Sequence, residues 1–182
     1  MNLSIGERLA NRIKVTPPVR LIVVSFLIVI ALGTVLLCLP FSSRNLTFTH
    51  PLDALFIATS ATCVTGLTPF DTWTHWNPFG QVVILCLIQV GGLGVASITS
   101  GVSVLLRKKL GLRELWLASE NANGGSLDVK RLLGIILRFT LVCEGVGAAL
   151  LMIRLIPEYG AYGIWASVFT SISAFCNAGF DI

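Results

Sequence analysis

Apolar residues follow the chain in three long runs, at positions 21–39, 81–106 and 132–153. The first two runs contain no charged residue, and the first has 19 residues. A helix of that length reaches about 28 Å at roughly 1.5 Å per residue, close to the thickness of the hydrocarbon core of a bilayer. The pattern therefore predicts an all-α membrane protein in which three helices cross the bilayer.

Two shorter apolar runs, at 51–62 and 163–175, have a helical pattern but are too short to cross a membrane. The first of them would reach only about 18 Å. Each run is followed by a short loop that contains a glycine, at 63–67 and 176–180. We expect two half-helices that stop inside the bilayer. Non-helical backbone at that depth is tolerated only where it is buried in protein or lines a water-filled cavity.

The two loops belong to an internal repeat. An offset of 113 residues places Gly66 on Gly179 and carries the run 21–39 onto the run that starts at Gly134. Further positions are identical in this register, among them Ser60 with Ser173, Ala61 with Ala174, Cys63 with Cys176 and Phe56 with Phe169. An internal repeat constrains the fold more than any single segment does.

The repeat divides the chain into four parts. We expect an N-terminal segment at 1–20, a first repeat at 21–106, a connecting loop at 107–131 and an incomplete second repeat at 132–182. The first repeat is predicted to contain a span at 21–39, a half-helix at 51–62, a loop at 63–67 and a span at 81–106. The second is predicted to contain a span at 132–153, a half-helix at 163–175 and a loop at 176–180. No span follows the second loop, so the second repeat is incomplete.

The charges give an orientation. Hydrophobic residues make up 54% of the chain and charged residues only 12%. Four Lys or Arg residues lie in 1–20 and six in 107–131, whereas 40–80 and 155–182 hold one between them, Arg44. The positive-inside rule then places the N-terminus and the 107–131 loop in the cytoplasm, with both glycine loops entered from outside. The cations lie between apolar runs and form no basic face, so a nucleic-acid partner is not indicated.

Several other chemistries receive little support. The five cysteines are an odd number and have no CxxC spacing, which favours reduced, buried thiols over disulfides or a zinc site. No paired carboxylates, nucleophile–base set or phosphate-binding loop is present, so an enzyme is not indicated. His75 is a lone histidine in its loop, so a surface role is favoured over metal ligation.

Glu144 lies about 12 residues into the third long run, near the expected middle of the membrane. An ionisable residue there is costly and is by default a functional-site hypothesis. The alternative is a packing residue that hydrogen-bonds a neighbouring helix, and both interpretations stay open. Arg138, six residues earlier, falls on a different face of the helix and is expected to extend toward the cytoplasmic interface.

The two loops suit cation conduction. A partly dehydrated cation needs oxygen ligands, and backbone carbonyls supply them without a full charge. Glycine permits the backbone conformation that such loops need, and the C-terminal ends of two half-helices add a negative potential. We therefore predict an ion filter made by the carbonyls of Cys63, Val64, Thr65 and Gly66 and of Cys176, Asn177, Ala178 and Gly179. A single loop would be better explained as a glycine bend in a helix hairpin; the repeat, the orientation and the half-helix lengths favour the filter.

Several motifs, in this order, resemble the Trk/Ktr/HKT superfamily of potassium transporters, and most closely the membrane subunit of bacterial Ktr systems. They are TCVTGL at 62–67, Asp71-Thr72, Phe79-Gly80-Gln81, QVGGLG at 89–94 and, in the second copy, SAFCNAGFDI at 173–182. The resemblance covers nearly the whole chain. It implies tandem repeats of helix, pore helix, filter and helix, four of which surround one pore in a full-length member. It also implies that Gly66 and Gly179 contribute to potassium selectivity.

The same resemblance implies the surroundings of the protein. Potassium is the expected transported ion, and coupling to sodium is left open. The expected partners are the lipid bilayer of the cell membrane, the missing C-terminal repeats, a second copy in a homodimer and a cytoplasmic nucleotide-binding regulatory subunit of the KtrA/TrkA type. No bound cofactor is expected. The gating loop and the basic residue that the family places in its third and fourth repeats have no counterpart in this chain.

Two other functions are weighed beside a transporter pore. One is a two-span cation channel subunit that assembles from identical copies. The unlike loops Val64-Thr65-Gly66 and Asn177-Ala178-Gly179 argue against it, because identical subunits need only one filter sequence. The other is a membrane scaffold that conducts no ions.

Overall fold

The computed structural model describes residues 18–108 and 125–182, and within these ranges the chain is helical and contains no strand. The helices are α2 (Pro18–Cys38), α3 (Pro51–Thr62), α4 (Thr72–His75), α5 (Pro78–Lys108), α7 (Gly125–Tyr159) and α8 (Tyr162–Phe175), with a single 3₁₀ turn, η1, at Pro40–Ser42. The all-α character predicted from the sequence is therefore confirmed for the described residues.

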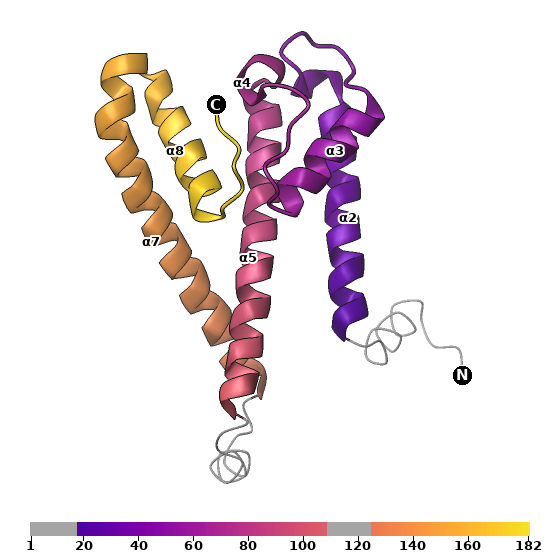
Figure 1. The fold of residues 1–182 in the computed structure, drawn as a ribbon, viewed down its shortest axis with the longest axis vertical. Helices are drawn as coiled ribbons and strands as arrows, with labels where there is room; N and C mark the ends of the chain where they lie inside the picture. The colour runs from indigo at the N-terminus through magenta and orange to yellow at the C-terminus, as the bar shows by residue number, and fades with distance from the viewer. Residues whose placement is uncertain (1–17, 109–124) are drawn as a thin grey trace.

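The helix α5 is the centre of the arrangement. It contacts α2 and α3 on one side and α7 and α8 on the other, while α3 packs against α2 and α8 packs against α7. Figure 1 shows the three long helices running along the molecule, with the two short helices entering from the top and ending part-way down α5. The chain thus forms two helix pairs that share one central helix.

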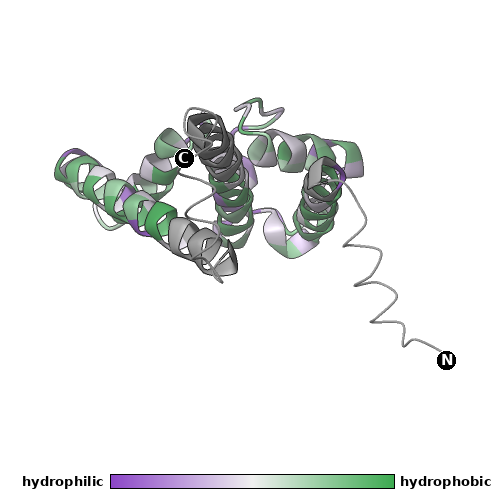
Figure 2. Cartoon of the chain, turned by 90° about the horizontal axis from the view of Figure 1, so that it is seen from below, coloured by the Kyte–Doolittle hydropathy of each residue, from purple (hydrophilic) through white to green (hydrophobic). Residues whose placement is uncertain are grey.

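Apolar side chains cover much of the outside. Figure 2 shows hydrophobic colouring on the outer faces of the long helices as well as between them. Large apolar residues are exposed along α2 and α7, among them Val23, Leu27, Leu32, Val35, Phe139, Val142, Val146, Leu150 and Ile153. A soluble monomer rarely exposes contiguous apolar surface on this scale, so these faces suit contact with lipid.

The three long helices differ in the length of their apolar stretch. Counted over the described residues only, Gly134–Tyr159 is long and apolar enough to cross one by itself. Val23–Cys38 and Pro78–Gly94 are apolar but shorter over that part of the chain.

The helix bounds differ from the sequence prediction at several places. The helix α2 begins at Pro18 and not at 21, and α7 begins at Gly125 and not at 132, so part of the segment predicted as a connecting loop is helical. The helix α5 begins at Pro78 and not at 81, because the Asn77 side chain accepts a hydrogen bond from the Gly80 N–H at 3.0 Å and caps the first turn.

The connection between the predicted span at 132–153 and the half-helix at 163–175 is shorter than expected, because α7 continues to Tyr159 and α8 begins at Tyr162. Pro157 lies inside the last turn of α7, where its missing N–H removes only one backbone hydrogen bond, and Gly160 reverses the chain with φ +61°.

Two of the segments predicted from sequence are mostly outside the described residues. They are the N-terminal segment 1–20 and the connecting loop 107–131, of which only the ends are described.

Candidate ion-conducting loops

The first half-helix has well-defined ends. Pro51 occupies the first helical position, and the His50 side chain accepts a hydrogen bond from the Leu52 N–H at 3.4 Å. At the other end the Thr62 hydroxyl donates to the carbonyl oxygen of Ala58 at 2.7 Å. The helix ends at Thr62, with Cys63 as its C-cap, and the carbonyl groups of its last turn are directed toward the loop that follows.

Both loops leave their half-helix through the same three backbone hydrogen bonds. In the first loop, the N–H groups of Cys63, Val64 and Thr65 donate to the carbonyls of Thr59, Ala61 and Ser60, at 2.8, 3.3 and 3.0 Å. In the second, those of Cys176, Asn177 and Ala178 donate to Ile172, Ala174 and Ser173, at 3.0, 3.0 and 2.8 Å. Every partner in one loop corresponds to a partner in the other at the 113-residue offset, so the two loops have matching backbone connections.

Left-handed backbone conformations also occur at matching positions. Gly66 and Gly179 have φ +75° and +73°, and Val64 and Asn177 have φ +58° and +59°. Glycine adopts this conformation freely and asparagine tolerates it, whereas a β-branched valine is rarely found there. The geometry at Val64 is therefore a local strain that the surrounding structure holds in place.

The two loops touch each other at their glycines. A Cβ atom added at Gly66 would lie 2.6 Å from the carbonyl oxygen of Ala178 and 3.3 Å from the Cα of Gly179. A Cβ added at Gly179 would lie 3.4 Å from the Cα of Gly66. The contact brings two backbones together that are more than a hundred positions apart in the sequence, and a larger residue at Gly66 would push them apart.

Two neighbouring glycines of α5 receive the ends of the two half-helices. A Cβ at Gly91 would overlap the carbonyl oxygen of Thr62, at the end of α3. A Cβ at Gly92 would lie 2.5 Å from the sulfur of Cys176, directly after α8. Small residues let helix backbones approach closely in membranes. Here they allow one helix to support both loops.

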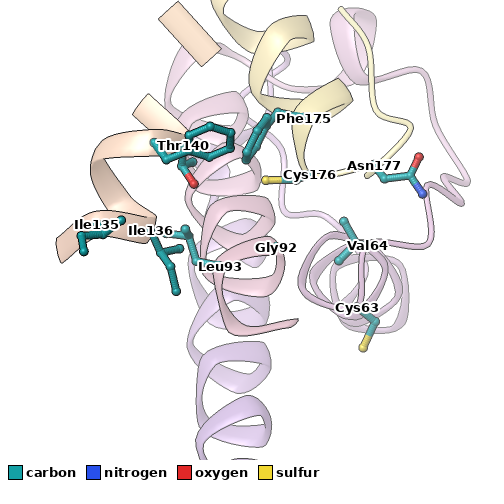
Figure 3. A pocket seen from close by; sticks show the side chains of 11 residues that line it. Cys63, Val64, Gly92, Leu93, Ile135, Ile136, Thr140, Phe175, Cys176 and Asn177 are labelled. Carbon is teal, nitrogen blue, oxygen red and sulfur yellow. The ribbon is translucent and has the colours of Figure 1, made fainter. Parts of the chain in front are cut away.

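A cavity of about 720 Å³ lies below the loops, between α5 and α7. Its walls include Cys63 and Val64 of the first loop, Cys176 and Asn177 of the second, and Phe139 and Thr140 of α7. Figure 3 shows these groups around the open space, with the sulfur of Cys176 directed toward the side where Thr140 lies. Among the described residues no group of three or more His, Cys, Asp or Glu gathers as a metal site.

An aromatic and polar cluster lies at the end of the molecule where α8 begins. The Arg44 guanidinium is 3.7 Å from the centre of the Trp73 ring, and Trp73 lies 4.0 Å from Tyr162, between ring centres. The indole N–H of Trp165 donates to Oε1 of the buried Gln81 at 2.7 Å. These contacts connect the first repeat to the start of α8.

Two ionisable groups near that cluster have shifted pKa values. Hydrogen bonds from the Thr74 backbone and side chain lower the pKa of the exposed Asp71 carboxyl, which caps α4. Partial burial lowers the pKa of His75, and the nearby Asp53 opposes that shift. The His75 ring stacks on Phe70 at 4.3 Å between ring centres.

Glu144 is buried on α7, with only 5% of its surface exposed. Its Oε1 has no hydrogen-bond partner among the described residues, and Gln89 of α5 is its polar neighbour. The backbone carbonyl of Glu144 accepts a hydrogen bond from the Ser171 hydroxyl of α8 at 2.7 Å. Its backbone thus anchors α8, while its side chain lies in the polar contact between α5 and the second loop.

The structure places all eight predicted loop residues after the two half-helices and brings Gly66, Ala178 and Gly179 together. Gly91 and Gly92 belong to the QVGGLG motif at 89–94, but the motif does not identify their separate partners. A signal was available, because the two glycines are adjacent and follow Gln89 near the middle of an apolar run. Nothing in the sequence alone shows that each one faces a different loop.

The model of the TrkH family, described as a cation transport protein, matches residues 8–182. The chain belongs to this family. It is 46% identical over 167 residues to the "Potassium/sodium uptake protein NtpJ" of Enterococcus hirae, an alignment that covers 91% of the chain and 37% of that protein.

Other members of the family are similar over most of the chain. It is 41% identical to the "Ktr system potassium uptake protein B" of Bacillus subtilis, covering 97% of the chain and 39% of the relative. With the protein of the same name from Vibrio alginolyticus it is 42% identical, covering 90% and 36%. The chain thus spans less than half the length of these relatives. Family membership confirms the resemblance found in the motifs and identifies a membrane protein of a transporter family, not an enzyme family.

Proposed function

We propose that this chain contributes two of the loops that form the ion filter of a potassium uptake transporter, with potassium passing along their backbone carbonyls. The observation that carries the proposal is the pair of loops with matching hydrogen bonds and matching φ values, in contact at Gly66 and Gly179. Two unlike sequences that adopt one backbone conformation at the tips of two half-helices fit a shared site better than two unrelated bends.

The electrostatics of the two half-helices support a cation as the occupant. Both helices end at their loops, and a helix C-terminus carries a partial negative charge. No Lys, Arg or His occurs in either loop. The names of the relatives add that potassium, and in one case also sodium, is taken up by members of this family.

The remaining parts of the proposal concern the assembly. The four residues of the first filter segment are Cys63, Val64, Thr65 and Gly66, and those of the second are Cys176, Asn177, Ala178 and Gly179. In the full-length protein, further repeats would complete the ring around the pore. The N-terminus would lie in the cytoplasm of a cell whose plasma membrane holds the transporter. A second copy and a nucleotide-binding regulatory subunit would be its partners, the latter facing the 107–131 loop, which lies mostly outside the described residues.

The test is substitution of the filter glycine in the full-length protein. Gly66→Ser places a side chain against the Ala178 carbonyl and disfavours φ +75°. We expect discrimination of potassium over sodium to fall by roughly ten-fold or more, the equivalent of about 1.4 kcal/mol, with similar protein levels in the membrane. Uptake of both ions, measured in cells that lack their own potassium transporters, gives the ratio.

A matched control is available on α7. Gly145→Ser introduces the same side chain where no atom lies within 4 Å of an added Cβ. The control should leave the ion ratio unchanged. An unchanged ratio in Gly66→Ser as well would reject the filter.

A further inference from the structure

The second loop has a polar support for which the first loop has no counterpart among the described residues. The sulfur of Cys176 lies 3.8 Å from Oε1 of Gln89, to which its S–H donates. Gln89 is in turn the polar neighbour of the buried Glu144 carboxyl. The three side chains come from the second loop, from α5 and from α7, so this contact joins the loop to both long helices beside it.

The equivalent positions in the first repeat are apolar. At the 113-residue offset, Glu144 corresponds to Ala31, and Ser171, which donates to the Glu144 carbonyl, corresponds to Ala58. The matching cysteine, Cys63, is exposed. The polar contact is therefore not a property of the repeat but an addition to its second copy.

Placing this contact inside the membrane has a cost. A buried carboxyl and a carboxamide in an apolar helix lose their hydration, and each polar group left without a partner costs free energy. Oε1 of Glu144 has no partner among the residues that the structure describes. A leucine in its place would avoid the cost, so packing alone does not explain a glutamate there.

We propose that Glu144 and Gln89 are positioning residues that hold the second loop from behind at Cys176, and that the ion selectivity of the pore depends on them. The proposal rests on the proposed function, because selectivity has a meaning only if the loops form a filter. Neither side chain touches the ion in this mechanism. Together they restrict movement of the backbone from Cys176 to Gly179, which faces Gly66 of the other loop.

The experiment uses the full-length transporter and two readouts. The first is the ratio of potassium to sodium uptake. The second is the rate at which N-ethylmaleimide labels each cysteine. Mass spectrometry measures this rate separately for each cysteine-containing peptide, so no cysteine has to be replaced. Cys63 serves as the internal reference, because it occupies the same position in the other loop and does not depend on Glu144.

Glu144→Leu should raise the labelling rate of Cys176 relative to Cys63 by roughly five-fold and lower the potassium-to-sodium ratio by a similar factor. Glu144→Gln keeps a polar group of the same shape beside Gln89 and should restore both values to within about two-fold of the parent. Gln89→Leu should reproduce the effects of Glu144→Leu. The double variant should be no worse than either single one, because both break the same contact.

A control and three opposing outcomes complete the test. Glu158→Gln changes an exposed glutamate of the same helix that pairs with Arg154, and should alter neither readout. An unchanged Cys176 rate in both leucine variants would overturn the proposal, and so would equal increases at Cys63 and Cys176, or additive effects in the double variant. If Glu144→Leu does not accumulate in the membrane, Gln89→Leu decides. A parent protein that takes up no potassium would reject the proposed function instead, while the labelling rates would still test the support of the loop.

Discussion

The first loop, at 63–67, and the second, at 176–180, have equivalent backbone hydrogen bonds but different surroundings. In the first, the Thr65 hydroxyl donates to Ser60 Oγ at 2.9 Å, and Cys63 is exposed. In the second, the equivalent serine, Ser173, accepts a hydrogen bond from the backbone N–H of Phe180 at 2.9 Å. Similar backbones are thus held by different side-chain contacts in the two loops.

The comparison separates two roles within each repeat. The half-helix, the serine and the glycine set the conformation of the loop, and they occur in both copies. The groups behind the loop differ, because α5 presents Gly91 to the first loop and Gly92 to the second. Conformation is thus a property of the repeat, whereas the rigidity of each loop depends on its neighbours.

The largest effect is expected from enlarging the glycines of α5. Gly91→Ala places a methyl group against a backbone carbonyl, that of Thr62, which cannot rotate away. Gly92→Ala meets the Cys176 side chain, whose sulfur can change rotamer. We expect Gly91→Ala to destabilise the full-length protein by roughly 1–3 kcal/mol and Gly92→Ala by less. Thermal unfolding in detergent measures the loss of stability of each variant, and potassium uptake measures the loss of function.

Gly145→Ala is the control for this pair, since an added Cβ there meets nothing within 4 Å. Equal destabilisation by Gly91→Ala and Gly145→Ala would show that the loops do not depend on close approach to α5.

Exchanging the left-handed residues should have opposite effects in the two loops. Asn177→Val introduces a β-branched residue at φ +59°, and we expect a loss of roughly 1 kcal/mol. Val64→Asn removes the same strain at φ +58° and should stabilise the first loop by a similar amount. Val64→Thr retains the branch and should be close to neutral. Thermal unfolding of the three variants provides the measurement, and a shift of the same sign in Asn177→Val and Val64→Asn would contradict the equivalence of the loops.

An effect of similar size is expected where the second half-helix contacts the first repeat. Trp165→Phe removes the 2.7 Å hydrogen bond to the buried Gln81 and leaves its Oε1 without that donor. The expected loss is about 1 kcal/mol. Ile164→Val, at the exposed neighbouring position, is the control. If both variants unfold at the parent temperature, this bond does not hold the two repeats together.

The smallest expected effect is a pH dependence of stability that arises at His75, the last residue of α4. Because burial lowers the pKa of His75 below its ordinary value of 6.5, the unfolded chain binds a proton there before the folded chain does. Stability should therefore be complete above pH 6.5 and decrease as the pH falls from 6.5 toward the folded pKa. His75→Asn should remove part of this dependence. His50→Asn, which retains a capping side chain at the start of α3, should not change it.

The sequence predicted the half-helices well because their ends carry local signals. Pro51 suits a first helical position, and α3 covers the same residues, Pro51–Thr62, as the predicted segment. The end of the third long helix was wrong, because the span was predicted to end at 153, whereas α7 continues through Pro157 to Tyr159. A proline near the end of a helix gives no local sign of whether one more turn follows.

The contacts between the loops could not be predicted, since they depend on how the helices pack. The offset of 113 residues aligned Gly66 with Gly179 but did not show that they touch. The partners of Glu144 were likewise open, because the sequence shows an isolated carboxyl and not the Gln89 side chain that α5 brings beside it.

The adjacent glycines of α5 also constrain how this chain can change during evolution. One inserted or deleted residue between Pro78 and Gly91 would turn both glycines by about 100° around the helix and move them by about 1.5 Å along it. The contacts of both loops with α5 would then be lost in a single event. The stretch from Pro78 to Gly91 should therefore tolerate substitutions far better than changes in length. A duplicated gene whose copies come to share one helix can no longer alter the length of that helix for one copy alone.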